Sequence, residues 1–185
     1  MPIPYKRYAR AHLTAAEQRE LTTVDGLACQ LRGHLTQRAA DIDLIHVHGA
    51  QSKDVQDVVA ELLCGHLRFG QEVVLTPQDG LVTRARPDFF FRLDDGRGIL
   101  AEVERGGTTL NNHDLKDLWK THVAPDAQHL FLVVPMANWN QNGSARDKPF
   151  PRVVQRLGAF FGDERREIDV LSVHIFGYGR ETPPA

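Results

Sequence analysis

The sequence predicts an α/β domain in which helices flank a mixed central β-sheet. Three observations favour this class: an amphipathic helix after Ser52, two consecutive apolar strands over residues 86–104, and a buried apolar run over residues 129–134 that follows another amphipathic helix. At 185 residues the chain suits one compact domain with a substantial core. Within it, we expect residues 1–50 to form a helical extension packed on a core of residues 51–185.

Two helix-start signals lie in the first third of the chain. Thr14 and Glu17 have the spacing of a capping box. Ser52 can cap a second helix, in which valines and leucines recur at steps of three and four residues. The elements predicted here are a helix over residues 15–35, a segment over 41–48 that fits a strand or a helix, a helix from Ser52 to Gly65 or Gly70, and a short strand over 72–76.

Strands and helices alternate in the second half. The run RPDFFFRL from Arg86 is a strand rich in aromatic residues, and a turn at residues 94–96 leads into a second apolar strand. Asn111 or Asn112 can cap a helix whose apolar stripe includes Trp119. The remaining elements are a buried strand over 129–134, a polar surface loop over 138–148, a helix over 151–161 opened by proline, and a last strand over 168–176.

Composition excludes several classes of protein. With 42% hydrophobic and 25% charged residues, the chain is typical of a globular protein rather than a disordered or fibrous one. A formal net charge of −2 means that any nucleic-acid contact would need a local basic patch. Cys29 and Cys64 lack the paired spacing of a zinc site, and we find no apolar segment of membrane-spanning or signal-peptide type. We therefore expect a reduced, cytoplasmic protein without membrane contact.

The turn between the two apolar strands can fix their register. A three-residue loop with glycine in its left-handed third position pairs Phe91 with Ile99 and, further out, Asp88 with Glu102. Glu104 then lies on the same face as this acidic pair, and apolar side chains fill the opposite face. A two-residue turn would instead mix the charges into the apolar face, so the longer loop is preferred.

Three carboxylates on neighbouring strands repel one another unless a positive charge lies among them. A hard divalent cation is the natural partner, and Mg²⁺ held by carboxylates also takes a substrate phosphate. Such an ion polarises a phosphoryl oxygen and lowers the pKa of a bound water, as phosphodiester hydrolysis requires. We expect Mn²⁺ to substitute for it. The alternative from the pattern alone is a solvated strand face whose acids point into water.

The letters Pro87-Asp88, a spacer and Glu102-Val103-Glu104 resemble the motif of the PD-(D/E)xK nuclease superfamily, the fold of many restriction endonucleases and repair nucleases. The resemblance implies a restriction-endonuclease-like α-β-β-β-α-β core. It also implies that Asp88 and Glu102 bind the metal, with the carbonyl of Val103 as a further ligand. Glu104 stands where most members have lysine, and it could act as general base or as a second metal ligand.

The same resemblance, which covers about residues 54–176, implies roles for the neighbouring helices. In some relatives the lysine lies on the following helix, where Lys116 would neutralise phosphate charge, ahead of Lys120 because it is nearer the helix start. An acid from the first core helix would be Glu61, which would assist in catalysis and metal binding, with Asp57 one turn earlier as the alternative.

A nuclease must also hold its substrate, which we expect to be DNA rather than RNA. Thr108 and Asn111, after a pair of glycines, could donate hydrogen bonds to a phosphate. Basic, amide and aromatic side chains near the N-terminus and in the later polar loop can contact phosphates or stack on bases. These further candidates are Lys6, Arg7, Arg10, Lys120, Trp139, Asn140, Arg146 and Lys148. The resemblance also implies a homodimer, since two strands must be cut.

The sequence thus predicts a Mg²⁺-dependent nuclease that hydrolyses phosphodiester bonds, a DNA endonuclease of restriction, defence or repair type. The rival hypothesis is a catalytically inactive protein of the same fold that binds nucleic acid or serves as an assembly subunit. Glu104 in the place of the usual lysine is the sign that favours this rival. A metal-dependent hydrolase of another phosphate ester is the third hypothesis.

Overall fold

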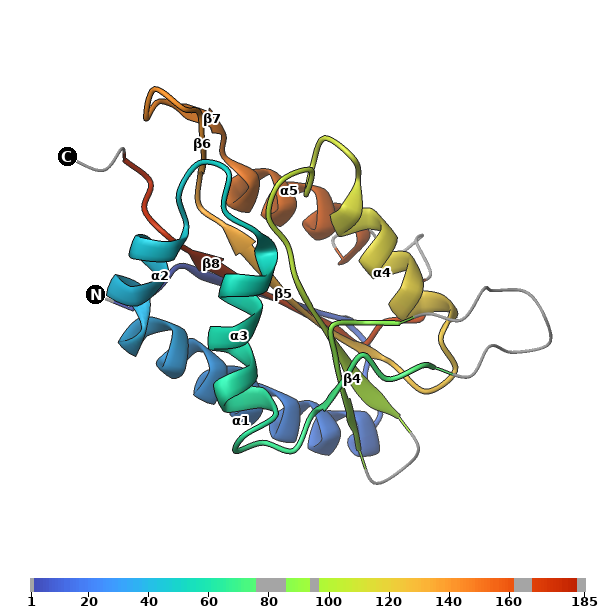
Figure 1. The fold of residues 1–185 in the computed structure, drawn as a ribbon. Helices are drawn as coiled ribbons and strands as arrows, with labels where there is room; N and C mark the ends of the chain where they lie inside the picture. Colours follow the sequence, from blue (N-terminus) through green and yellow to red (C-terminus); the bar gives the residue numbers. More distant parts are fainter. Residues whose placement is uncertain (1, 76–85, 94–96, 162–167, 183–185) are drawn as a thin grey trace.

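The computed structural model describes residues 2–75, 86–93, 97–161 and 168–182, and places helices on both faces of a central sheet (Figure 1). The sheet of the described residues has six strands in the order β1-β8-β5-β4-β3-β2. The helices are α1 (Ala15–Gln37), α2 (Ala39–Ile45), α3 (Ser52–Leu63), α4 (His113–Val123) and α5 (Pro149–Phe161). The strands are β1 (Tyr5–Ala9), β2 (Gly70–Gln71), β3 (Phe89–Arg92), β4 (Gly98–Val103), β5 (His129–Pro135), β6 (Asn138–Trp139), β7 (Ala145–Asp147) and β8 (Ser172–Tyr178).

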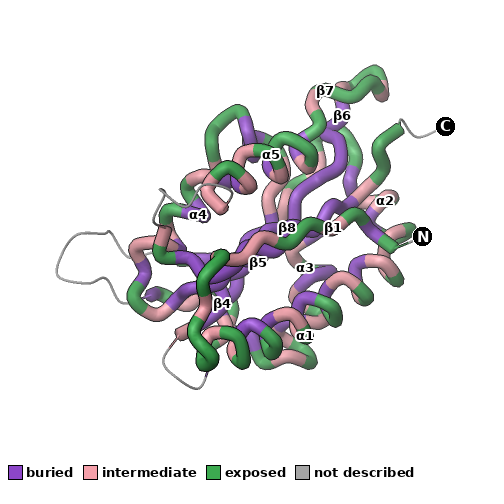
Figure 2. The backbone as a smooth tube through the Cα atoms, turned by 180° about the vertical axis from the view of Figure 1, so that it is seen from behind, coloured by how far each residue is buried: buried purple, intermediate pink, exposed green. Residues whose placement is uncertain are grey.

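The sheet is mixed, as predicted. Strands β4, β5 and β8 run parallel at its centre, whereas β3 pairs antiparallel with β4 and β1 pairs antiparallel with β8. Every residue of the three central strands is buried, and Figure 2 shows them enclosed between the helices. Helices α1 to α3 cover one face and helices α4 and α5 the other (Figure 1). Parallel strands need such cover because their crossover helices lie on both faces.

Elements of the N-terminal half follow the sequence signals with three differences. The capping box is confirmed, since Thr14 N–H donates to Glu17 at 2.7 Å and Glu17 N–H donates to Thr14 at 3.2 Å. The segment left open is helix α2, and the edge strand β1 was not predicted. Ser52 is the first residue of α3 rather than its cap. The strand predicted over 72–76 is wrong in its described part, because β2 ends at Gln71 and Glu72 has a φ of +50°.

The register predicted for the hairpin is confirmed. Phe91 pairs with Ile99 and Phe90 with Leu100. Leu93 N–H donates to the Arg97 carbonyl at 2.7 Å, which places the two chain ends as a three-residue loop requires. The loop itself, residues 94–96, lies outside the described residues. The face with Ile99 packs into the core under α1 and α3, and the face with Leu100 packs under α4 and α5.

Two predictions about buried faces are wrong. Trp119 is 61% exposed rather than part of a buried stripe, and the inward face of α4 carries Asp114, Asp117, Leu118 and Thr121. The segment 138–148 is the β6–β7 hairpin rather than a loop, and Trp139 within it is 8% exposed. Trp119 was expected to face the core because it is apolar. Residues 138–148 were expected to lie on the surface because the segment is polar.

Smaller shifts affect the last two elements. Helix α5 begins at Pro149 instead of Pro151, and β8 covers Ser172–Tyr178 instead of 168–176. None of the helices in the described ranges has the length and apolarity that crossing a membrane requires.

A chain of polar side chains crosses the sheet beneath α1. Nδ1 of His129 lies 2.7 Å from Oγ of Ser172, which lies 3.0 Å from Nε2 of His174. The chain ends on Glu20 of α1 and on the Tyr5 hydroxyl of β1. Burial lowers the pKa of His174 to about 3 and also lowers the pKa of His129. Both rings are therefore neutral in the folded protein at neutral pH.

We expect the free energy of unfolding to fall as the pH drops below about 6.5, because the unfolded chain then binds a proton that buried His174 does not bind. Between pH 7.5 and pH 5 this residue should remove about 2 kcal/mol. His174→Gln cannot titrate and should lose that much less over the same interval. Urea unfolding at both pH values measures the difference, and equal losses in the two proteins would contradict this account.

Candidate active site

Two carboxylates are joined across the β3–β4 hairpin by backbone hydrogen bonds. Val103 N–H donates to Oδ2 of Asp88 at 2.8 Å, and Asp88 N–H donates to Oε2 of Glu102 at 3.2 Å. Each acid is therefore held by the backbone of the opposite strand, which places both at the same end of the hairpin. Glu102 is only 5% exposed because β4 is a central strand.

Helix α4 adds an acid and a lysine that pack against Glu102. Nζ of Lys120 lies 2.5 Å from Oε1 of Glu102 and 2.8 Å from Oδ1 of Asp117. Asp117 is 2% exposed, and its side chain also hydrogen-bonds to that of Glu104. Together with Glu104, these side chains form a group that we call the acid cluster: Asp88, Glu102, Glu104, Asp117 and the counter-ion Lys120.

Glu104 follows the last residue of β4 and is held by neighbouring strands. Its N–H donates to the Val133 carbonyl at 2.9 Å, and the Tyr178 hydroxyl donates to its carbonyl at 2.8 Å. Nδ1 of His113, at the start of α4, lies 2.9 Å from its Oε2. The backbone position and the side-chain direction of Glu104 are thus both fixed.

Burial and mutual repulsion make the cluster hard to ionise. Burial, followed by the charge of Asp117, raises the pKa of Glu102 to about 8 and that of Glu104 to about 9. Burial also raises the pKa values of Asp88 and Asp117. Burial alone would lower the pKa of Lys120, but Asp117 and Glu102 outweigh it and raise this pKa. The acid cluster therefore favours binding of a further cation in addition to the Lys120 ammonium.

The donor set suits a hard divalent ion. Carboxylate oxygens are the ligands that Mg²⁺ takes, and the buried Asp117, which hydrogen-bonds to the side chain of Glu104, adds a further carboxylate beside Glu102. As they stand, no three His, Cys, Asp or Glu side chains of the described residues are arranged to hold a metal ion. The Lys120 ammonium lies between Glu102 and Asp117 instead. The chemistry of the ligands therefore fits Mg²⁺, while a positive side chain already contacts two of them.

The helices contribute Lys120, the second choice from the sequence, and not the preferred Lys116 or Glu61. Lys120 contacts the cluster, whereas Lys116 is exposed, because positions 117 and 120 share the inward side of α4 and position 116 does not. Glu61 forms an ion pair with Arg38 and is half-exposed, away from the acids. The α3 residue that contacts the cluster is Gln56, whose side chain hydrogen-bonds to Asp88.

Asp57, the alternative to Glu61, pairs with Lys53 at 2.5 Å and is exposed. Sequence reasoning missed Gln56 and His113 as well as Asp117. The spacing along the helix could have indicated Asp117. It lies three residues before Lys120, so the two side chains share a helix face.

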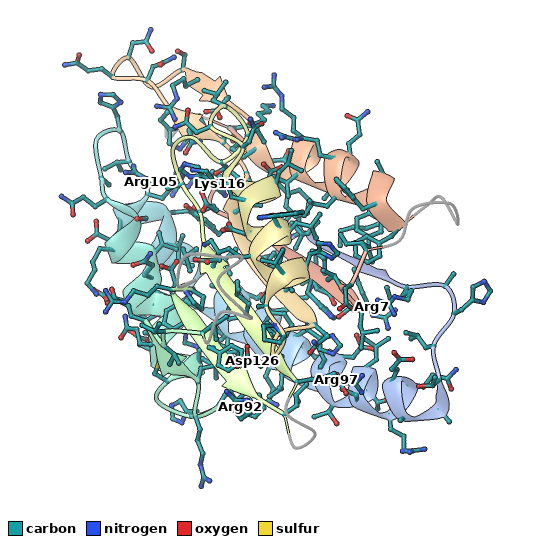
Figure 3. All side chains as sticks on the ribbon, turned by 90° about the vertical axis from the view of Figure 1, so that its right-hand side faces the viewer. Arg7, Arg92, Arg97, Arg105, Lys116 and Asp126 are labelled. Atoms are coloured by element: carbon teal, nitrogen blue, oxygen red, sulfur yellow. The ribbon has the colours of Figure 1, made fainter. Side chains whose placement is uncertain are left out.

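The N-terminal basic residues lie far from the acid cluster. They are on or just after β1, and β8 and β5 separate β1 from β4. Arg7 pairs with Asp25 at 2.7 Å, and Arg10 lies 3.4 Å from Asp169. Lys6 lies over the Tyr8 ring, 5.1 Å from its centroid. Figure 3 shows Arg7 well separated from Arg105 and Lys116, which lie toward one end of the molecule.

The loop after β4 carries the candidates Thr108 and Asn111, and Arg146 of the β6–β7 hairpin reaches it. Thr108 is buried, and its hydroxyl donates to the Arg105 carbonyl, so this hydroxyl is already used. Asn111 is exposed and packs over Gly107, whose φ of +91° favours glycine and where a Cβ would lie 2.6 Å from Nδ2 of Asn111. Arg146 from β7 reaches Gly106, where a Cβ would lie 3.3 Å from its Nη2.

The other members of the β6–β7 candidate group differ in exposure. Trp139 is buried and unable to stack on a base without movement. Asn140 bonds to Ser144 across the hairpin at 3.0 Å, and Lys148 is exposed. Arg146 is therefore the basic residue that the hairpin presents beside the loop after β4, and Lys148 is an exposed lysine just after β7.

Comparison with known proteins identifies the fold. Neither a family model nor a curated protein matches the sequence. Among solved structures, the restriction endonuclease BglII complexed with a DNA 16-mer matches with a TM-score of 0.55 and 14% identity, over 97% of this chain and 77% of the other. The chain has a restriction-endonuclease-like fold. The predicted fold class is confirmed, and at this identity the match concerns the fold alone.

The raised pKa values make a stability test of the cluster possible. For Glu104, with a folded pKa of about 9 against 4.5, stability is lost as the pH rises through this interval, because the unfolded chain releases a proton that the folded one keeps. Glu104→Gln is neutral throughout. We expect it to raise the free energy of unfolding at pH 8 in EDTA by about 1–2 kcal/mol.

The control is Glu61→Gln, an exposed acid whose replacement should change stability by less than about 1 kcal/mol. Chemical unfolding of the three proteins at pH 5 and pH 8 provides the measurement. A Glu104→Gln protein that is less stable than the wild type at pH 8 would contradict the crowding of buried acids.

Proposed function

We propose that this chain is a Mg²⁺-dependent nuclease that hydrolyses phosphodiester bonds in DNA, with the acid cluster as its active site. The observation that carries the proposal is the pair Asp88 and Glu102, cross-bonded to each other's strand, with Asp88 half-buried and Glu102 buried, in a restriction-endonuclease-like sheet. A buried acid such as Glu102 destabilises a domain, which favours a functional role for this side chain.

The proposed roles follow from the positions of the side chains. Asp88 and Glu102 would hold the ion, with the carbonyl of Val103, the residue after Glu102 in β4, as a further ligand and Mn²⁺ as a substitute metal. When bound, Mg²⁺ would polarise a phosphoryl oxygen and lower the pKa of a water. Glu104 is the candidate base once the charge of a bound ion has lowered its raised pKa, and Nδ1 of His113 lies 2.9 Å from its Oε2.

Lys120 is the proposed partner of the scissile phosphate, since it is the lysine that contacts the cluster. Asn111, Arg146 and Lys148 would contact the DNA backbone beside the loop after β4. DNA is favoured because the solved structure with the same fold is a complex with DNA. A homodimer would place two such sites on the two strands of a duplex.

A second candidate function has its own observation. The Lys120 ammonium between Glu102 and Asp117 satisfies charge that a metal would otherwise satisfy, as expected for a protein that binds nucleic acid without cutting it. Such a protein would shift DNA in a gel with or without divalent ions and would leave it intact. The cleavage assay below separates the two functions.

Cleavage of plasmid and linear DNA, with RNA in parallel, tests the nuclease. We expect cleavage in Mg²⁺ or Mn²⁺ that EDTA abolishes, and a loss of about 100-fold or more in Asp88→Asn and Glu102→Gln, since each removes a metal ligand. Glu61→Gln, an acid that pairs with Arg38 outside the cluster, is the matched control and should retain activity within about three-fold. Cleavage that survives both cluster substitutions, or its absence with every metal and substrate, would refute the enzyme.

A further inference from the structure

Among the described residues, Lys120 is the lysine that forms ion pairs with acids of the cluster. Its Nζ contacts Glu102 at 2.5 Å and Asp117 at 2.8 Å. The partners of Asp88 are uncharged, namely the Val103 N–H and the Gln56 side chain. Lys120 therefore lies at one side of the cluster, against Glu102, where a cation would share the same oxygens.

Guanidinium groups near the cluster are engaged elsewhere. Arg105 donates to the Val47 carbonyl, and Arg156 lies 3.4 Å from Asp114 and donates to the Thr109 carbonyl. These contacts hold both arginines on the loops around the site. Relief of the repulsion between Glu102 and Asp117 thus falls to Lys120, so the cluster in this state has a counter-ion of its own.

The lysine has a route out of this position. Its side chain is 30% exposed, whereas those of Glu102 and Asp117 are 7% and 3% exposed. Asp117 lies three residues before Lys120 on α4, so the two stay neighbours on the helix whatever happens at β4. The ammonium can therefore leave Glu102 while it remains beside Asp117.

We propose that Lys120 is a built-in competitor of the metal: it occupies the cation position on Glu102 in the free protein, and a divalent ion binds by displacing it from Glu102 while it stays beside Asp117. This inference rests on the metal site of the proposed function and adds a regulation to it. After displacement, the Lys120 ammonium would lie next to the bound ion. There it could interact with the negative charge of a substrate phosphate. Asp117 is then the positioning residue that keeps Lys120 at the site.

Competition between Lys120 and the metal predicts how the affinity for the metal changes when Lys120 is replaced. Removal of the competing charge should tighten metal binding, although the same substitution removes a group proposed for catalysis. A residue that only supports the fold would weaken metal binding when it is lost. The sign of the change in affinity therefore separates the two roles.

The test measures Mn²⁺ binding at pH 8 without DNA, by the electron paramagnetic resonance signal of free Mn²⁺. We expect Lys120→Met to bind Mn²⁺ about ten-fold or more tightly than the wild type, because no ammonium competes for Glu102. Lys120→Arg keeps the charge and should show no such gain. Lys116→Met, an exposed lysine one turn earlier on the same helix, should stay within about two-fold.

Lys120→Gln keeps a hydrogen-bond donor for Glu102 without the charge, and it serves the same test should Lys120→Met fail to fold. Unchanged or weaker binding in the uncharged variants would overturn the proposal. An equal gain in Lys116→Met would also overturn it, as a general charge effect, and so would a wild type and variants that bind no Mn²⁺. Tighter binding in a protein that cuts no DNA would refute the nuclease and leave the competition standing.

Discussion

The hydrogen bond from the Val103 amide to the Asp88 carboxylate fixes the arrangement on which the candidate site depends. It ties the residue before β3 to the last residue of β4, so the register of one hairpin decides that Asp88 and Glu102 meet. A shift by one residue would turn Glu102 to the other face of the sheet, among the side chains packed under α1 and α3. The apolar alternation of both strands prevents that shift. A shifted register would turn apolar side chains away from the core on one face of the sheet and would place charged side chains in the core on the other face.

Burial of β4 gives this pairing its chemical consequence. An acid on an edge strand could turn to water, but β4 lies between β3 and β5 and under α4, so Glu102 stays in a medium that penalises its charge. Helix α4 adds Asp117 to the crowding and Lys120 to relieve it. The crowded acids lower the stability of the fold and hold several carboxylate oxygens in fixed positions. Such a loss of stability is expected where side chains serve binding rather than folding.

The sequence was informative where one physical effect dominated. Period-two alternation and turn chemistry were enough for the hairpin register, and side-chain caps were enough for α1. The face of α4 could not be predicted in this way, because the rule that apolar residues turn inward fails where an inward acid has a half-buried lysine as partner. Trp119 lies outside for that reason, with Asp117 and Lys120 toward the cluster. Gln56 was missed because the resemblance pointed to an acid, and only three-dimensional contact separates it from Asp57 and Glu61.

The central claim is that Asp88 and Glu102 together bind a divalent ion, and anomalous diffraction from a crystal grown in Mn²⁺ tests it most directly. The account predicts a manganese peak within bonding distance of both carboxylates, with the Lys120 ammonium released from Glu102 and still beside Asp117. A crystal at saturating Mn²⁺ without a peak at this position, and with Lys120 still on Glu102, would contradict it.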